Sequence, residues 1–458
     1  MHSSKLSIAA GVSLALRLAT AVKPEVNVYF GQYGTDTLAS YCDSGGFDSV
    51  TLAFLSASPE ADPATNYPAT DFGTHCGTGV YMINNTASRL LSGCTGLASD
   101  IQYCQRLGKK VLLSTGGVWS PDPARNYAVT TEANGEFFAD FLWNAFGAYN
   151  ASWAGPRPFD TSSGKHTVLD GFDFDIEVEV LAQKGYIAML KRLRGLVDIY
   201  NSAVGFQKVL ITGAPQCPLI DGWADMKEII STTAFDRLWI QFYNNDICQA
   251  GTARFNYAEW EAFISDGASQ NARLYVGLPA SMDTVGYVST EEANTLVDNL
   301  RNRSSFGGVM IWDASIAKGN ALNGVPMYQA IRNHMDQVSA TPSPSYTRSS
   351  TVLSAASSFA TSFSGNVSHS SILSSGYVQP TSSVIITDTC TSRTHGSTSS
   401  SAPTTTASTT PVDNGAPTIT HANPSHTFSP VASAQRAQAK SSLPFFTVVV
   451  AFFMTVYA

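Results

Sequence analysis

The chain has 458 residues, of which 44% are hydrophobic and 11% aromatic, so it is long enough for two or three domains with a sizeable core. Its formal net charge of −8 at pH 7 disfavours a nucleic-acid partner, because nucleic-acid binding needs basic patches.

The first 21 residues read as a secretory signal peptide. Lys5 gives a short basic start, residues 6–16 form an apolar stretch, and Ala19-Thr20-Ala21 fits a small-residue cleavage site. The apolar stretch is too short to span a bilayer. We therefore expect export into an oxidising compartment.

Residues 22–337 form the next predicted domain. Eight short apolar runs in it have β character, and helix-like stretches at residues 136–149, 182–200 and 291–301 lie between several of them. The runs cover residues 26–30, 49–54, 110–114, 171–177, 209–214, 237–242, 274–278 and 308–312. This alternation predicts an α/β fold, a (β/α)8 TIM barrel. A doubly wound open sheet is the main alternative, but no Gly-rich phosphate loop follows a strand.

The predicted strand in LDGFDFDIEVEV, residues 169–180, alternates carboxylates with apolar side chains. Since side chains of a strand alternate between faces, one face carries the acids and the other the apolar residues. The acidic face comprises Asp173, Asp175, Glu177 and Glu179. In a barrel it would point inward and climb toward the C-terminal mouth, where active sites of this fold lie. Crowded carboxylates raise at least one pKa, which suits a general acid. The alternatives are an oxygen-only metal site or a solvated edge strand.

Cysteines and glycosylation sequons agree with export. Six cysteines allow fifteen pairings, so their spacing does not choose among them, and none has zinc-finger spacing. They are Cys42, Cys76, Cys94, Cys104, Cys217 and Cys248. Four N-x-Ser/Thr sequons begin at Asn84, Asn150, Asn302 and Asn366.

Residues 338–433 are dominated by Ser and Thr and have no sustained apolar period. Such a segment cannot bury enough apolar surface to offset its ordering entropy, so we predict a disordered, O-glycosylated stalk. Cys390 lies within it.

Residues 434–458 read as a GPI-anchor signal. An uncharged apolar run covers residues 443–458, and a mostly polar spacer separates it from Ala432-Ser433-Ala434. The predicted attachment residue is Ser433 or Ala432, and a short tail anchor is the alternative. We thus expect a membrane partner through the lipid anchor, on the outer face of the plasma membrane, with transfer to wall glucan also expected.

Asp170-Gly171-Phe172-Asp173-Phe174-Asp175-Ile176-Glu177 matches the D-G-x-D-x-D-x-E signature of glycoside hydrolase family 18. Further stretches resemble its class III, hevamine-like chitinases, in family order. They are VYFGQYG at 28–34, LLSTGG at 112–117, APQCP at 214–218, QFYNN at 241–245 and GGVMIWDAS at 307–315. The resemblance covers residues 23–337, and fungal wall chitinases of this branch often carry a stalk and an anchor.

The resemblance implies a (β/α)8 enzyme that hydrolyses β-1,4-linked N-acetylglucosamine polymers with retention. Such enzymes use the substrate's 2-acetamido oxygen in place of a carboxylate nucleophile. It implies that Glu177 protonates the leaving oxygen and later activates water, and that Asp175 holds the acetamide N–H. It further implies that Asp173 shares a proton with Asp175 and that Tyr243 donates its hydroxyl to the acetamide oxygen. No cofactor and no metal are implied.

The resemblance also gives binding residues and disulfides. Trp312 would stack on a sugar, Gln241 would bind the same sugar, and Gly117 would lie near it. Tyr29 would line that subsite, although by itself it could equally be a packing residue. The implied disulfides are Cys42–Cys104, Cys76–Cys94 and Cys217–Cys248.

Other functions are compatible with the family. An endo-β-N-acetylglucosaminidase acting on N-glycans and a catalytically inactive chitin-binding wall protein are the alternatives. We expect chitin or its oligosaccharides as substrate and a monomeric protein. Hydrolysis of a chitin oligomer, compared with release of a high-mannose glycan, separates these functions.

Overall fold

The computed structural model describes residues 23–161, 163–177, 183–205, 209–220 and 226–340. The predicted signal peptide, the GPI signal with Ser433, Cys390, Asn366 and Glu179 lie outside the described residues, as does the predicted stalk beyond residue 340.

Within the described residues, eight parallel strands close into a barrel. They are β1 (Glu25–Phe30), β2 (Ser49–Ala57), β6 (Lys110–Gly117), β7 (Gly171–Ile176), β8 (Leu210–Gly213), β9 (Arg237–Gln241), β10 (Arg273–Pro279) and β11 (Phe306–Trp312). Each strand pairs with the next, and β1 pairs with both β2 and β11. This closure excludes an open sheet, and the eight predicted runs coincide with the eight strands, so the barrel prediction is confirmed.

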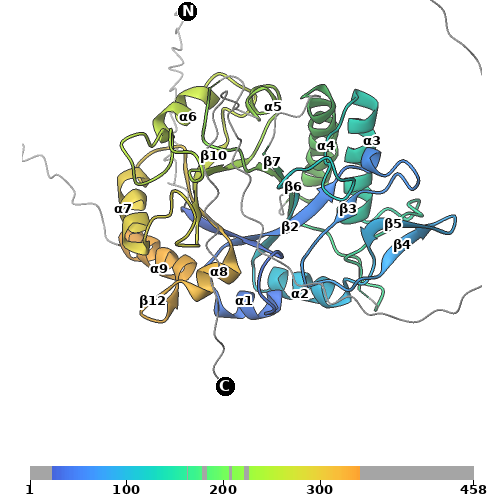
Figure 1. The fold of residues 1–458 in the computed structure, drawn as a ribbon, viewed down its shortest axis with the longest axis horizontal. Coiled ribbons are helices and arrows are strands. Elements are labelled where there is room, and N and C mark those ends of the chain that lie inside the picture. Colours follow the sequence, from blue (N-terminus) through green and yellow to red (C-terminus); the bar gives the residue numbers. More distant parts are fainter. Residues whose placement is uncertain (1–22, 162, 178–182, 206–208, 221–225, 341–458) are drawn as a thin grey trace, which may run out of the picture. The chain divides into compact units, whose positions relative to one another are not determined.

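Helices surround the ring of strands (Figure 1). They are α1 (Leu38–Ser44), α2 (Thr95–Arg106), α3 (Glu132–Phe146), α4 (Gln183–Val204), α5 (Lys227–Thr232), α6 (Tyr257–Ile264), α7 (Thr290–Leu300), α8 (Ala314–Gly319) and α9 (Met327–Ala340). Short additions are the 3-10 turn η1 (Pro59–Ala61), strand β3 (Ala69–Thr70) antiparallel to β2, and the pairs β4–β5 (Val80–Ile83, Thr86–Leu91) and β12–β13 (Ala321–Leu322, Val325–Pro326).

Some helix ends differ from the sequence expectation. Helix α3 begins four residues earlier than predicted, because Thr131 caps it by accepting the Asn134 N–H at 3.1 Å. It ends at Phe146, before Gly147. Helix α9 extends to Ala340 and so takes in three residues assigned above to the stalk.

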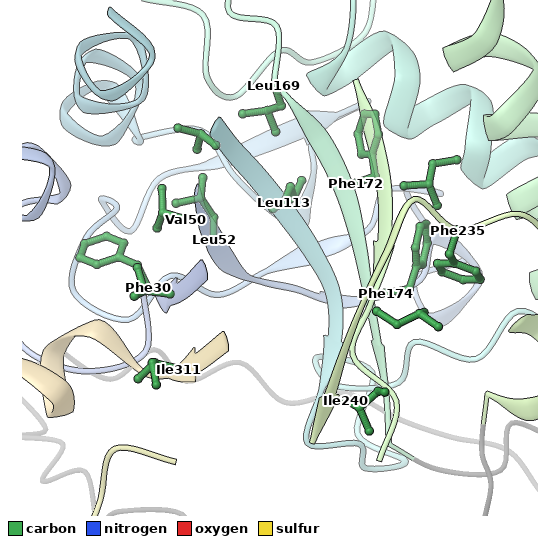
Figure 2. Packing of buried hydrophobic residues seen from close by; sticks show 14 of the residues in the cluster. Phe30, Val50, Leu52, Leu113, Leu169, Phe172, Phe174, Phe235, Ile240 and Ile311 are labelled. Atoms are coloured by element: carbon green, nitrogen blue, oxygen red, sulfur yellow. The ribbon is translucent and has the colours of Figure 1, made fainter. Parts of the chain in front are cut away.

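The apolar core lies mainly between the strands and the helices (Figure 2). On β7, Phe172, Phe174 and Ile176 belong to this outer layer and are at most 1% exposed. Asp173 and Asp175 alternate with them and so point into the barrel. The inner cluster is smaller and includes Trp239, Tyr275 and Met310. The β7 pattern therefore separates a packed outer face from an acidic inner face.

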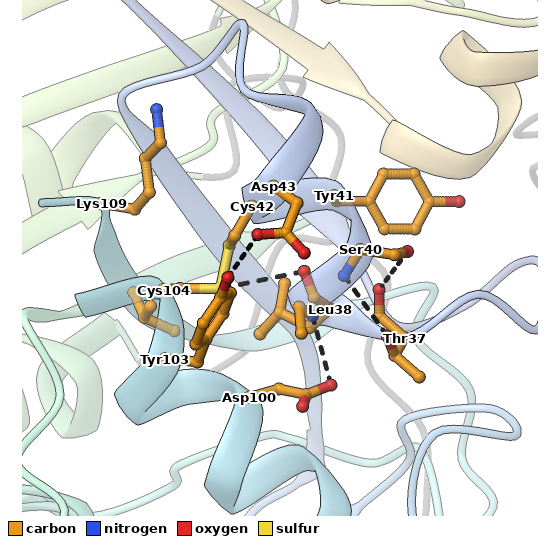
Figure 3. The surroundings of a disulfide bond; sticks show 12 residues. Thr37, Leu38, Ser40, Tyr41, Cys42, Asp43, Asp100, Tyr103, Cys104 and Lys109 are labelled. Carbon is orange, nitrogen blue, oxygen red and sulfur yellow. Dashed lines mark hydrogen bonds between the residues drawn. A yellow bond between two sulfur atoms is a disulfide. The ribbon is translucent and has the colours of Figure 1, made fainter. Parts of the chain in front are cut away.

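The three disulfides implied by the resemblance are confirmed. Cys42–Cys104, Cys76–Cys94 and Cys217–Cys248 have Cα–Cα distances of 5.5, 4.5 and 5.9 Å. The first joins α1 to α2, beside the hydrogen bond from Ala39 N–H to Asp100 Oδ2 (Figure 3). Of the four predicted sequons, those at Asn84, Asn150 and Asn302 are exposed.

Among the described residues, no helix combines the length and apolarity needed to cross a membrane.

Candidate active site

Asp173 lies at the floor of the acidic column and is fully buried. In the strand register it stands opposite Ser114 on β6 and Thr212 on β8. Its carboxylate accepts four hydrogen bonds, each from a different strand. The donors are Tyr29 Oη (2.6 Å) and Ser114 Oγ (2.7 Å) to Oδ2, and Thr212 Oγ1 (2.5 Å) and Trp239 Nε1 (2.8 Å) to Oδ1.

The four donors oppose the effect of burial on Asp173. Burial raises the pKa of Asp173, and the hydrogen bonds from Thr212, Tyr29, Ser114 and Trp239 lower it, with burial the larger effect. Among the described residues, no hydrogen bond joins Asp173 to Asp175, and donors occupy both oxygens of Asp173. The proton sharing that the resemblance implies between the two stays a prediction.

Asp175 and Glu177, higher on the same face, meet at one amide. Gln241 Nε2 lies 2.8 Å from Asp175 Oδ1, 3.0 Å from Ala214 O and 3.4 Å from Glu177 Oε1. Asp175 is 4% exposed, whereas Glu177 is half-buried just past the end of β7. Burial raises the pKa of Asp175 well above its usual range, and the neighbouring charges of Glu177 and Asp173 raise it further. Asp175 thus resists ionisation beside a more accessible carboxyl group.

Tyr243 faces this carboxylate pair from the loop after β9. It is 6% exposed, and burial followed by the charges of Asp175 and Glu177 raises the pKa of its hydroxyl well above the usual range. The hydroxyl therefore stays protonated and can donate a hydrogen bond to a group bound between these side chains.

An aromatic wall follows the end of β11. The Trp312 ring is stacked at 28° on Phe54, with centroids 5.7 Å apart, and meets Tyr29 edge-on at 5.4 Å. Tyr29 is 1% exposed and its hydroxyl is bonded to Asp173, so it lies beneath the wall. Gly117 has φ +84°, and a Cβ there would come within 2.9 Å of the Phe54 ring, so a glycine is needed for this close packing.

The main chain of Glu177 is held by a tyrosine from the loop after β6. The Glu177 N–H donates to Tyr127 Oη at 3.2 Å, and that hydroxyl donates to Gly117 O at 2.9 Å. Tyr127 is fully buried. The Tyr127 hydroxyl therefore links Glu177, just past the end of β7, to Gly117 at the end of β6.

Among the described residues, no group of three or more His, Cys, Asp or Glu side chains could hold a metal ion. The arrangement is instead that of an acid–base site. One accessible carboxyl, one buried carboxyl, an amide and a phenol converge beside an aromatic surface.

The sequence model described as Glycosyl hydrolases family 18 matches residues 25–284. The chain belongs to this family. It is 36% identical over 369 residues to "Endochitinase A" of Aspergillus niger, an alignment covering 76% of this chain and 28% of that protein. It is 35% identical over 373 residues to "Endochitinase A1" of Aspergillus fumigatus, with coverages of 77% and 42%. The chain thus spans less than half the length of these relatives.

Solved structures agree with the family 18 fold. A chitinase from Ipomoea carnea matches with a TM-score of 0.52 and 26% identity, over 68% of this chain and 99% of that one. A xylanase and α-amylase inhibitor, XAIP-III, matches with a TM-score of 0.51 and 24% identity over the same shares. The second likeness concerns the fold alone.

The structure places Asp173 and Asp175 on β7 and Glu177 just past its end, with Gln241 of β9 and Tyr243 of the following loop beside Asp175 and Glu177. Trp312, at the end of β11, contacts Tyr29 and Phe54, and Gly117 packs against Phe54. The roles that the resemblance implies for these residues stay predictions. Phe54 and Tyr127 were not predicted. Phe54 ends a predicted apolar run and reads there as a core residue, and Tyr127 lies in a loop without any periodic pattern. Only the pairing across the barrel reveals their contacts.

Proposed function

We propose that this protein is an endo-acting chitinase of the class III type, which cleaves β-1,4 links of N-acetylglucosamine polymers with retention by substrate-assisted catalysis. The observation that carries the proposal is the meeting of Asp175 and Glu177 on the Gln241 amide, with Tyr243 beside them. Trp312 supplies a flat apolar surface suited to a pyranose ring.

Glu177 is the proton donor in this proposal. It is half-buried at the end of β7, where a glycosidic oxygen can reach it, and its backbone is fixed by Tyr127. Its carboxyl proton passes to the leaving oxygen as the C1–O bond breaks. In the second step the resulting carboxylate takes a proton from the water that attacks C1.

The substrate's own acetamide oxygen forms the new bond to C1 in the first step and gives a cyclic oxazolinium ion. Asp175 accepts the acetamide N–H and stabilises the positive charge, while the Tyr243 hydroxyl orients the acetamide oxygen. Water then opens the ring from the opposite face. Two successive inversions at C1 return the β-anomer.

The test is product analysis by proton NMR immediately after a chitin oligomer is added to the purified protein. We expect hydrolysis at internal links with the β-anomer formed first, and hydrolysis at least about 10²-fold slower by Glu177→Gln. An initial α-anomer would overturn the mechanism. Release of a high-mannose glycan without chitin cleavage would identify an endo-β-N-acetylglucosaminidase. Binding without any cleavage would identify an inactive binding protein.

We further propose that the protein is secreted and held at the cell surface by a GPI anchor, where it remodels wall chitin. Supporting features are the signal-like residues 1–21, the Ser/Thr-rich segment and the apolar run at 443–458. The three disulfides suit an oxidising compartment. A variant lacking residues 443–458 should appear in the medium. If it stays attached to cells, the anchor proposal is wrong.

A further inference from the structure

Asp313 follows Trp312 and links β11 to α8. Its side chain is 1% exposed. Oδ1 caps α8 by accepting the Ile316 N–H at 3.0 Å, whereas Oδ2 is buried without a hydrogen-bond partner. A buried carboxylate oxygen without a donor is costly, and capping alone needs only one oxygen. The second oxygen therefore points to a further role.

Tyr33 connects Asp313 to the site. Its ring meets Trp312 edge-on, with centroids 6.1 Å apart and planes at 79°. After burial, the Asp313 charge is the cause that raises the pKa of the Tyr33 hydroxyl, and Tyr33 in turn raises the pKa of Tyr243. The half-buried Tyr33 ring thus contacts Trp312, and the Tyr33 hydroxyl lies within electrostatic range of Asp313 and Tyr243.

The backbone that carries Tyr33 is fixed on two sides. His75 Nε2 lies 3.2 Å from Tyr33 O. A Cβ on the next residue, Gly34, would lie 2.0 Å from Ser315 Oγ, so the loop packs directly against the start of α8. We therefore expect the Tyr33 side chain, and not its main chain, to move if the conformation of this region changes.

Asp313 lies in a region that holds several other titratable groups. Burial raises the pKa of Asp313 to about 7, against the opposing effect of the Ile316 and Ser315 backbone N–H groups. Asp36 and Lys318 pair at 2.8 Å and offset each other. The titratable groups facing this region from the packed elements are Tyr33 and Asp36 after β1, Tyr41 of α1, His75 of the loop after β3, Lys318 of α8 and Tyr328 of α9.

We propose that Asp313 is a positioning residue for the sugar site and that its ionisation state controls, through Tyr33, the wall formed by Trp312. With the neutral acid, Tyr33 keeps the position it has in the structure, edge-on to Trp312. When Asp313 is ionised, its Oδ2 needs a donor, and the Tyr33 hydroxyl turns toward it. The neutral form is the one that binds sugar, a statement that rests on the proposed function.

A test without substrate uses fluorine NMR of protein labelled with 5-fluorotryptophan, in which Trp312→Phe assigns the Trp312 signal. We expect this signal to move with pH around a midpoint of about 7 in the wild type. In Asp313→Asn the movement should vanish, because asparagine caps a helix equally well but does not ionise. A pH-independent signal, or an identical titration in Asp313→Asn, would overturn the proposal.

Two further variants make this titration specific. Asp100→Asn is the matched control, because burial also raises the pKa of Asp100, which likewise accepts a backbone N–H, from Ala39 at 3.2 Å. It should keep the wild-type titration of Trp312. Tyr33→Phe retains the ring without the hydroxyl and should weaken the titration, which keeps the proposal testable if Asp313→Asn folds poorly. Full movement in Tyr33→Phe would contradict the role of Tyr33.

The consequence for binding is measured with a chitin oligomer in the Glu177→Gln background, where turnover is slowed. We expect the Kd to rise several-fold as pH passes about 7, and to stay flat when Asp313→Asn is added. Equal titration in both proteins would refute the positioning role. If the oligomer binds neither protein at acid pH, the proposed function fails, while the fluorine titration still decides whether Asp313 controls Trp312.

Discussion

The floor and the mouth of the barrel hold carboxylates of the same strand in different surroundings. At the floor, Asp173 accepts hydrogen bonds from four side chains on four strands. At the mouth, Asp175 and Glu177 share the amide of Gln241. A carboxylate whose acceptor positions are filled by donors from several strands holds these strands together. We infer from this contrast that Asp173 contributes strongly to stability at the floor, while Asp175 and Glu177 carry the chemistry at the mouth; the proton sharing implied for Asp173 stays a prediction.

The largest loss of activity is expected when Glu177, at the mouth, is replaced. Glu177→Gln removes the proposed proton donor and keeps its size, so kcat should fall by about 10²–10⁴-fold with little change in Tm. Hydrolysis of a chitin oligomer and thermal unfolding of the same preparation measure both quantities. Near-normal turnover in a folded variant would mean that the mouth does not supply the acid.

Substitutions of Asp175 and Tyr243 should lower kcat somewhat less than Glu177→Gln does. Each is proposed to hold one end of the acetamide, and contacts of this kind are commonly worth about 3–4 kcal/mol at the transition state. Asp175→Asn and Tyr243→Phe should lower kcat strongly and change KM less. Because both act on one group, the double variant should lose less than the product of the single losses. Independent, multiplicative losses would contradict a shared target.

At the floor the effect should appear in stability. Asp173→Ala leaves four buried donors without an acceptor, and even one such group costs about 1–3 kcal/mol, so Tm should fall strongly. Asp173→Asn is the matched control. Its oxygen can face Trp239 Nε1, which only donates, and its NH2 group can face the hydroxyls of Tyr29 and Ser114, which can also accept. We expect a much smaller loss of Tm for Asp173→Asn, and equal losses would refute this account of the floor.

The sequence predicts the barrel and the acidic column well because both depend on local alternation. The eight strands are short apolar runs, and the two faces of β7 follow directly from a period of two. The disulfides and the roles of Tyr243 and Trp312 came from the family resemblance. Neither route gives the donors of Asp173, since these depend on register, with Ser114 and Thr212 opposite it on separate strands. The Tyr127 bridge and the Phe54 stack depend on packing between loops and strands distant in sequence.

Tyr29 is the residue where floor and mouth come into direct contact, and Tyr29→Phe should have the smallest effect. The ring touches Trp312 and Phe54 of the wall, while the hydroxyl donates to Asp173 of the floor at 2.6 Å. The family resemblance places Tyr29 in the sugar subsite, but it is only 1% exposed. Phenylalanine keeps the ring and removes one of four donors, so the free energy of unfolding should fall by about 1 kcal/mol. If Tyr29 belongs to the floor, KM for a chitin oligomer will stay near its wild-type value while Tm drops slightly. A raised KM with an unchanged Tm would instead place the hydroxyl in contact with the sugar, and the boundary between floor and mouth would then lie below Tyr29.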